Sequence, residues 1–209
     1  MAGLRETKKR RTRETIAQAA ADLFVEHGFA SVTVDDVARA AGVSRQTVFN
    51  YFPSKEQMLF DREQEVGAAL VALVVDVPDG AALVEAFRGH TRAFWERFGA
   101  VLAGGGDTHG FWEIVRASPA LRDYAEASAG RQAREVGEAL ARAWGRPPAD
   151  PTCQGLARAL CGVNLAFLTC GLERLTDGED PATVVAEMIE QSGGAYAALE
   201  RGLGAYAPA

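Results

Sequence analysis

The chain has 209 residues, enough for one large domain or for one small and one medium domain. Hydrophobic residues make up 48% of it and charged residues 24%, which is the composition of an ordinary globular protein. No uninterrupted apolar run reaches the roughly 18 residues of a membrane-spanning helix, and the charged N-terminus lacks the apolar core of a secretory signal. We therefore expect a cytoplasmic protein without a membrane partner.

The charge is unevenly distributed along the chain. The net charge is −6 and the pI is near 5.2, values that by themselves argue against a nucleic-acid partner. Residues 1–52 nevertheless hold eight basic and six acidic side chains, a balance of +2, whereas the remainder holds fourteen and twenty-two, a balance of −8. Six of the basic residues lie within the first thirteen positions. This pattern predicts a basic arm beside a DNA-reading segment.

The arm leads into a predicted helix that carries Ile16, Ala20, Leu23 and Phe24 on one apolar face and ends at Gly28. Such a helix gives the following segment an apolar surface to pack on. We expect it to form the first of three helices in a small N-terminal domain.

The segment from Thr33 to Phe52 has the pattern of a helix-turn-helix. Thr33 and Asp36 form a capping box that starts the first helix by satisfying its orphan backbone donors. Gly42 follows the last apolar position of that helix, where a left-handed glycine often ends the helix. Ser44 then caps a second helix. This arrangement lays the second helix in the major groove of DNA.

Several spaced motifs agree with one known family. Residues 11–59 resemble the N-terminal domain of the tetracycline-repressor-like (TetR) family of bacterial transcription regulators. The motifs that carry the resemblance are Leu23-Phe24, Glu26-His27-Gly28-Phe29, Thr33-Val34-Asp35-Asp36-Val37-Ala38, Ala41-Gly42-Val43-Ser44 and Tyr51-Phe52-Pro53-Ser54-Lys55. The resemblance implies a DNA-binding regulator, usually a repressor. After Leu59 it thins to a general all-helical pattern.

The residues expected to contact DNA lie on or beside the second helix. In its first turn, Arg45 can fork onto guanine, Gln46 onto adenine, and the methyl group of Thr47 can contact thymine. Asn50 lies one turn further, and the resemblance implies that Tyr51 and Lys55 hold the DNA backbone. The predicted DNA-binding residues are Thr33, Ser44, Arg45, Gln46, Thr47, Asn50, Tyr51 and Lys55, where Thr33 and Ser44 also place helix N-termini near phosphate oxygens.

The rest of the chain reads as helices separated by glycine and proline. We expect them over residues 54–76, 81–102, 108–117, 119–145, 151–176 and 181–203, with a loop at Gly104–Gly106 that moves with ligand. The sequence thus predicts an all-α protein. Its helix-turn-helix domain with the basic arm covers 1–53, and a ligand-binding and dimerisation domain covers 54–209.

The last two predicted helices carry matching apolar stripes. Large residues recur from Leu156 to Cys170 and from Val185 to Leu203, and a stripe of small residues runs from Gly155 to Ala166. Large and small stripes together let helices approach closely. One interpretation is a helical hairpin buried within one subunit. We favour a homodimer through these two helices, because two-fold symmetric operators match two-fold symmetric proteins.

The central region is rich in aromatic residues with a few polar ones among them. A helical core explains part of this pattern, but polar groups embedded among aromatic rings are also typical of a ligand pocket. The candidate residues for a hydrophobic or aromatic effector are Phe87, His90, Thr91, Phe94, Trp95, Phe111, Trp112, Asn164 and Phe167. A drug-like molecule, a polyketide-type metabolite and a fatty-acyl thioester all fit this description.

The sequence offers no catalytic constellation, cofactor motif or metal motif. Cys153, Cys161 and Cys170 lack C-x-x-C spacing, and we expect reduced thiols in place of a metal or redox site. We therefore predict a non-enzymatic, ligand-responsive regulator of a palindromic double-stranded DNA operator. The alternative is a constitutive DNA-binding protein without a small-molecule effector.

Overall fold

The computed structural model describes residues 2–104 and 109–203, and these residues form ten helices. Gly105 and Gly106 of the expected moving loop lie outside the described residues, and the side chains of Phe111 and Leu203 are also outside them. The ten helices divide between two compact units. The first comprises residues 1–64 and 110–124, and the second comprises residues 65–109 and 125–209.

The first unit is built on α1 (Ala2–His27), which ends at Gly28 with a φ of 78°. The helices α2 (Val34–Ala40), α3 (Arg45–Tyr51) and α4 (Glu56–Leu59) follow it. Each contributes fully or almost fully buried side chains to one core, namely Ile16, Ala20, Phe24, Val37, Val48, Phe52 and Met58. This packing confirms the predicted helix-turn-helix with its supporting helix.

Two later segments join the core of the first unit. They are α7 (His109–Ala117) and the first turn of α8 (Pro119–Ala143). Ile114, Val115 and Leu121 are buried in this core, and Trp112 packs against it. The chain therefore returns to its reading domain after more than forty residues in the second unit.

The predicted single helix over 54–76 is wrong, because the structure contains α4 and a separate α5 (Glu63–Ala72). Between them the ring of Phe60 stacks on Tyr124, with centroids 5.3 Å apart. The guanidinium of Arg13 donates to the carbonyl oxygen of Asp61 at 3.1 Å, an oxygen that a continuous helix would use for itself. Tertiary contacts therefore favour the break.

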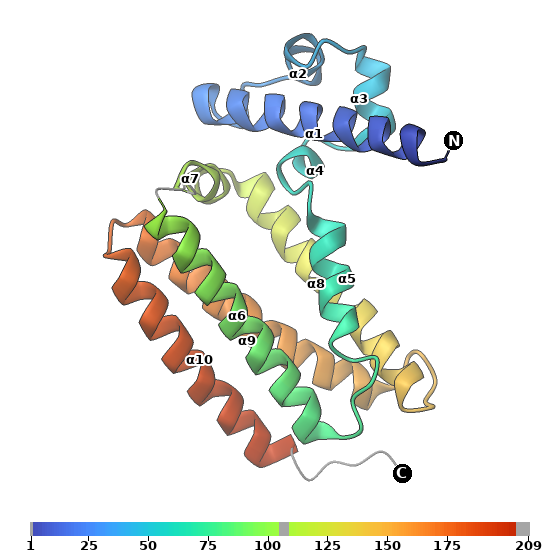
Figure 1. The fold of residues 1–209 in the computed structure, drawn as a ribbon, viewed down its shortest axis with the longest axis vertical. Helices are drawn as coiled ribbons and strands as arrows, with labels where there is room; N and C mark the ends of the chain where they lie inside the picture. Colours follow the sequence, from blue (N-terminus) through green and yellow to red (C-terminus); the bar gives the residue numbers. More distant parts are fainter. Residues whose placement is uncertain (1, 105–108, 204–209) are drawn as a thin grey trace. The chain divides into compact units, whose positions relative to one another are not determined.

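In the second unit, α6 (Gly80–Ala103), α9 (Pro151–Thr176) and α10 (Pro181–Leu203) lie side by side as long helices (Figure 1). Their bounds agree with the predicted ones within two residues. Asp79 caps α6 and Asp150 caps α9, each through its carboxylate. The core they share with α5 and α8 includes Leu70, Leu83, Val84, Phe87, Leu140, Leu160 and Tyr196.

The helix α9 is long and apolar enough to cross a membrane by length and composition. In the sequence, Arg158 interrupts the apolar run of this helix, although the average hydropathy of the helix stays high. A third of the apolar window is buried, and α9 supplies Cys153, Leu156 and Leu160 to the core of the second unit. These contacts are those of a core helix in a folded domain.

Candidate nucleic-acid interface

The turn between α2 and α3 is fixed by the residues that the sequence singled out. Thr33 Oγ1 accepts from the backbone N–H of Asp36 at 3.2 Å, and the N–H of Thr33 donates to Asp36 Oδ2 at 3.0 Å. The hydroxyl and the backbone N–H of Thr33, which both donate to the carboxylate, lower the pKa of Asp36. This is the predicted capping box, so the start of α2 is confirmed.

Two further features orient α3. Gly42 has a φ of 66°, a left-handed conformation that glycine adopts without a Cβ clash. Ser44 Oγ accepts from the N–H of Thr47 at 3.0 Å and caps the helix. Val48 on the inner face is fully buried, so α3 is held against the core by one face only.

The outer face of α3 presents polar side chains. Arg45, Gln46 and Asn50 are exposed, and Thr47 is half-buried at the capped end. Gln46 Nε2 donates to Asn50 Oδ1 at 3.2 Å, which places the two amides side by side. The structure therefore brings these predicted residues to one surface, where donors and acceptors face outward, as base readout in a groove requires.

Arg45 has two neighbours, one on α2 and one on α3. Its Nη1 donates to Asp35 Oδ2 on α2 at 3.0 Å, and its guanidinium carbon lies 5.5 Å from the centroid of the Phe49 ring. Phe49 is 38% exposed, so part of its ring lies at the surface beside Arg45. The signal for this cluster was the i, i+4 spacing of Arg45 and Phe49 on the predicted helix.

Lys55 has a structural role in addition to its predicted contact with the DNA backbone. Its ammonium donates to the carbonyl oxygens of Phe29 and Val32 at 2.6 and 2.9 Å, and it lies 4.1 Å from the Phe29 ring centroid. Burial lowers the pKa of Lys55 from its ordinary value. Two of its three donors are thus used within the domain, and contact with DNA stays a prediction.

Arg13 and Ser54 make further contacts within the reading domain. Arg13, counted with the basic arm, donates to the carbonyl oxygen of Tyr51 at 2.9 Å and covers the Phe52 ring at 4.3 Å. It therefore ties α1 to the end of α3. Lys55 occupies the N-cap position of α4, and Ser54 Oγ accepts from the backbone N–H of Gln57 at 3.4 Å.

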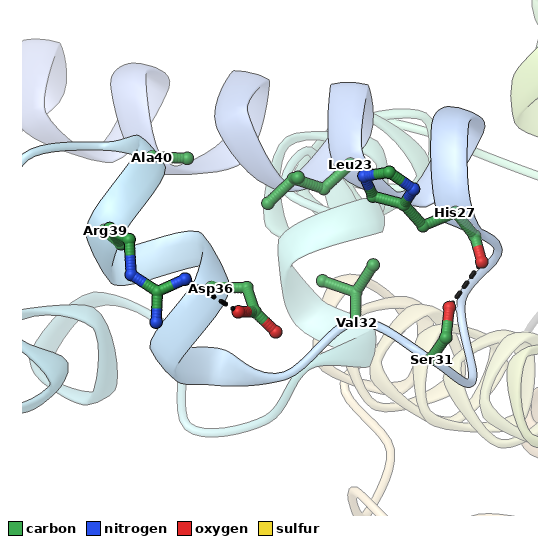
Figure 2. A pocket seen from close by; sticks show the side chains of 7 residues that line it. All are labelled: Leu23, His27, Ser31, Val32, Asp36, Arg39 and Ala40. Atoms are coloured by element: carbon green, nitrogen blue, oxygen red, sulfur yellow. Dashed lines mark hydrogen bonds and ion pairs between the residues drawn. The ribbon is translucent and has the colours of Figure 1, made fainter.

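A hollow of about 670 Å³ lies between α1 and α2 (Figure 2). Its lining residues are Leu23, His27, Ser31, Val32, Asp36, Arg39 and Ala40. Arg39 Nη1 pairs with Asp36 Oδ1 at 3.1 Å, and Ser31 Oγ donates to the carbonyl oxygen of His27, as Figure 2 shows. Asp36 is also committed to the cap of α2, so the hollow follows from the architecture of the reading domain.

The second unit brings several predicted effector residues together. Thr91 Oγ1 donates to Asn164 Oδ1 at 2.9 Å and also lies 2.9 Å from the hydroxyl of Tyr196. Phe94 lies edge-on to Trp95, with ring centroids 5.3 Å apart, and stacks on Phe98. Thr91 and Trp95 are almost completely buried. Tyr196 was missed because its apolar neighbours placed it in the helix stripe.

Other residues of that set have packing roles. Phe87 is fully buried in the core of the second unit, Phe167 is half-buried on α9, and Trp112 packs against the core of the first unit. Phe111 lies in α7, with a side chain outside the described residues. His90 is half-buried, and its pKa is lowered first by burial and then by the charge of Arg97. Effector contact by these residues stays a prediction.

A capped helix-turn-helix with an outward polar face defines the chain as a helix-turn-helix protein of the DNA-reading type. Residues 16–61 match the model of the family described as bacterial regulatory proteins, tetR family. Residues 16–61 therefore form a DNA-binding domain of the TetR family of transcriptional regulators.

Individual relatives support the family and the fold. The transcriptional regulator MftR of Mycobacterium tuberculosis is 38% identical over 79 residues, which cover 38% of this chain and 40% of that protein. The chain thus spans about two fifths of the length of its curated relatives. NalD, the secondary repressor of the MexAB-OprM multidrug efflux pump in Pseudomonas aeruginosa, shares the fold, with a TM-score of 0.54, 22% identity and coverage of 93% and 98%.

Thermus thermophilus FadR, a TetR-family transcriptional repressor in complex with lauroyl-CoA, is 25% identical to this chain. Its TM-score is 0.50, and the match covers 88% of this chain and 92% of FadR. The all-helical architecture predicted from the sequence is therefore confirmed by the structure and by its neighbours.

Proposed function

We propose that this chain is an intracellular DNA-binding transcriptional regulator, typically a repressor, that reads a palindromic operator through α3. The observation that carries the proposal is the outward face of α3, where Arg45, Gln46 and Asn50 are exposed while Val48 anchors the helix. Arginine forks onto guanine and glutamine onto adenine in the major groove.

A substitution on this face tests the proposal. Gln46→Ala removes the amide that reads adenine and leaves the capped fold intact, since Gln46 is exposed. We expect affinity for a selected operator to fall by about 1–3 kcal/mol, with affinity for unrelated DNA unchanged. Equal losses on both DNAs in an anisotropy titration would contradict base readout by α3.

We further propose that two copies associate through α9 and α10. The outward side of α9 carries exposed small residues at Gly155, Ala159, Gly162 and Ala166. On α10, Ala186, Gly194 and Ala198 are exposed in the same way. Small residues that recur on one face let helices of two subunits approach closely.

Part of the large stripes expected at this interface is buried inside the subunit instead. Leu156 and Leu160 of α9 and Met188 and Tyr196 of α10 are buried within the subunit. The internal-hairpin interpretation therefore holds for these residues, and the proposed dimer face consists of the small residues together with half-buried neighbours such as Phe167.

We propose that the effector is a hydrophobic small molecule that binds in the second unit and releases the operator. Three features support this. Thr91, Asn164 and Tyr196 form a polar cluster inside an apolar core, and His90 favours its neutral form. The buried Nε1 of Trp95 has no hydrogen-bond partner among the described residues, so an acceptor on a ligand would satisfy it. FadR binds lauroyl-CoA on the same fold.

The alternative is a constitutive DNA-binding protein. A variant that keeps Trp95 and carries Trp112→Phe and Trp144→Phe reports on the second unit by fluorescence. Lauroyl-CoA and an anilinonaphthalene sulfonate serve as probes. Saturable quenching that accompanies loss of operator binding supports the effector proposal. Quenching that leaves operator affinity unchanged supports the constitutive alternative.

A further inference from the structure

The guanidinium group of Arg45 is held from two sides. On one side its Nη1 donates to Asp35 Oδ2 at 3.0 Å, and on the other its carbon lies 5.5 Å from the centroid of the Phe49 ring. Asp35 belongs to the first turn of α2, whereas Arg45 and Phe49 lie one turn apart on α3. The two helices of the motif therefore meet at this arginine.

The capping box of α2 does not use the carboxylate of Asp35. The neighbouring Asp36 supplies both bonds of the capping box, and Asp35 bonds to neither Thr33 nor the turn. The ion pair itself is exposed, with 61% of the Arg45 side chain and 54% of the Asp35 side chain accessible. Exposed pairs of this kind contribute little to stability. A negative charge beside the reading helix also repels phosphates and opposes binding to any DNA.

The contact with Asp35 leaves Arg45 able to read a base. A guanidinium has five N–H donors, and the contact with Asp35 uses one of them. The other donors can still fork onto the O6 and N7 atoms of guanine. An unrestrained arginine would also reach phosphate oxygens, which are abundant and carry no sequence information. A carboxylate that fixes the guanidinium limits this competition.

We propose that Asp35 is a positioning residue for base readout, which together with Phe49 holds Arg45 in the orientation that selects guanine. The inference rests on the proposed function, because it assumes that α3 reads bases. Asp35 then lowers the affinity for all DNA through its charge, and it raises the preference for guanine over other bases. Phe49 supplies the second restraint through its ring.

The experiment uses the full chain and a library of random duplex DNA. The wild type, Asp35→Asn, Arg45→Ala and the double variant each select sequences, and their affinities are then measured on the selected operator. Affinities are also measured on two further duplexes. In the first, the guanine that the wild type enriches and Arg45→Ala does not is replaced by another base. The second has an unrelated sequence. Asp22→Asn is the matched control, because it removes an exposed carboxylate on α1. That carboxylate accepts a hydrogen bond from Gln18 of the same helix.

We expect Asp35→Asn to lower the preference for that guanine about tenfold, within the range of a lost bidentate contact. Affinity for unrelated DNA should rise. In the Arg45→Ala background, Asp35→Asn should leave the base preference unchanged, which a general disturbance of the fold would not predict. Asp35→Glu, which keeps the carboxylate, should restore part of the preference. The melting temperature should stay close to that of the wild type and of Asp22→Asn.

Three results would overturn the inference. An unchanged base preference in Asp35→Asn would show that Asp35 does not position Arg45. A higher affinity for the operator with the preference intact would make Asp35 a competitor of DNA for the arginine. A preference lost equally in the Arg45→Ala background would place the effect elsewhere. If the wild type enriched no sequence at all, the proposed function itself would fail, and this outcome is distinct from the other three.

Discussion

Lys55 uses its ammonium group inside the reading domain, where it joins the carbonyl oxygens of Phe29 and Val32 to the start of α4. We predict that Lys55→Met lowers the free energy of unfolding by about 1–3 kcal/mol, because two carbonyl groups lose a charged donor. Urea denaturation measures the change. Lys8→Met, at an exposed position of α1, removes the same charge and should change stability by less than about 0.5 kcal/mol. Equal stability of both variants would contradict the structural role of Lys55.

The same contacts affect how DNA-binding data for Lys55 are read. A substitution that weakens all DNA alike is the expected result for a phosphate contact. Partial unfolding of the reading domain has the same effect. Binding by Lys55 variants therefore has to be measured at a temperature where the variant is fully folded.

His90 gives a prediction for pH dependence. Burial, followed by the charge of Arg97, lowers the pKa of His90 below its unfolded value near 6.5. As the pH falls below that value, the unfolded chain takes up a proton while the folded chain stays neutral, so stability falls. Above it both states are neutral and the contribution vanishes. We expect His90→Gln to lose less stability than the wild type between pH 7 and pH 5.5. Parallel pH profiles from chemical denaturation would refute the assignment.

At the scale of the helices, Gly171 permits the close approach of α9 and α6. A Cβ atom at this position would lie 2.3 Å from Cη2 of Trp95 and 2.9 Å from Cγ of Met188. Trp95 is fully buried and has little space to move. We predict that Gly171→Ala destabilises the chain by about 1–3 kcal/mol and shifts the tryptophan emission.

Gly130→Ala is the control for that substitution. Gly130 lies within α8, and a Cβ atom there would have no neighbour within 4 Å. Replacing glycine by alanine inside a helix should stabilise it by up to about 1 kcal/mol. Thermal melting compares the two variants. If Gly171→Ala raised the melting temperature as Gly130→Ala is expected to do, the contact between Trp95 and Gly171 would not be tight.

The outward face of α9 gives a further prediction at this scale. We expect Ala166→Asp to dissociate the dimer, because an unpaired charge in a desolvated interface costs several kcal/mol. Operator affinity should fall although the reading domain is unchanged. Glu173→Gln, at another exposed position of α9, is the control for altered charge on this helix. Sedimentation that shows an intact dimer for Ala166→Asp would exclude this face.

The reactivity of the cysteine thiols provides a second test of the proposed dimer face on α9. Burial raises the pKa of Cys161 to about 11, and burial together with Asp150 does the same for Cys153. Both thiols are therefore protonated near neutral pH and slow to react. Cys170 is exposed on the outward side of α9, so alkylation at Cys170 should be suppressed in the dimer.

The ends of most elements could be predicted from the sequence because local chemistry determines them. Thr33, Ser44 and Asp79 accept backbone N–H groups within three residues, and Gly28 and Gly42 adopt left-handed φ values. The break between α4 and α5 could not be predicted, since it depends on contacts with Arg13 and Tyr124.

The same distinction applies to the candidate sites. The exposed face of α3 follows from helical spacing, so the residues predicted to contact DNA lie together on one surface. The contact of Asp35 with Arg45 and those of Lys55 with two carbonyl groups join different elements, and their geometry appears only after folding. Trp112 packs on the core of the first unit, a contact that its place in the sequence did not indicate.

At the scale of the whole molecule, two helices continue from one unit into the other. The helix α5 begins in the first unit and continues into the second, and α8 does the same after residue 124. The proposed effector can lower operator affinity only by its own preference for the non-binding state, typically ~1–3 kcal/mol, and the operator must weaken effector binding equally.

The central claim is that two copies of α3 read a two-fold symmetric DNA site. Sequencing of duplex fragments selected by the purified full chain tests it most directly. We predict one enriched palindrome whose half-sites are centred about one helical turn, roughly 34 Å, apart or a multiple of that distance. Guanine and adenine within each half-site should lose their enrichment in Arg45→Ala and Gln46→Ala respectively. Selection of no sequence, or of a site without two-fold symmetry that both variants still select, would contradict the account.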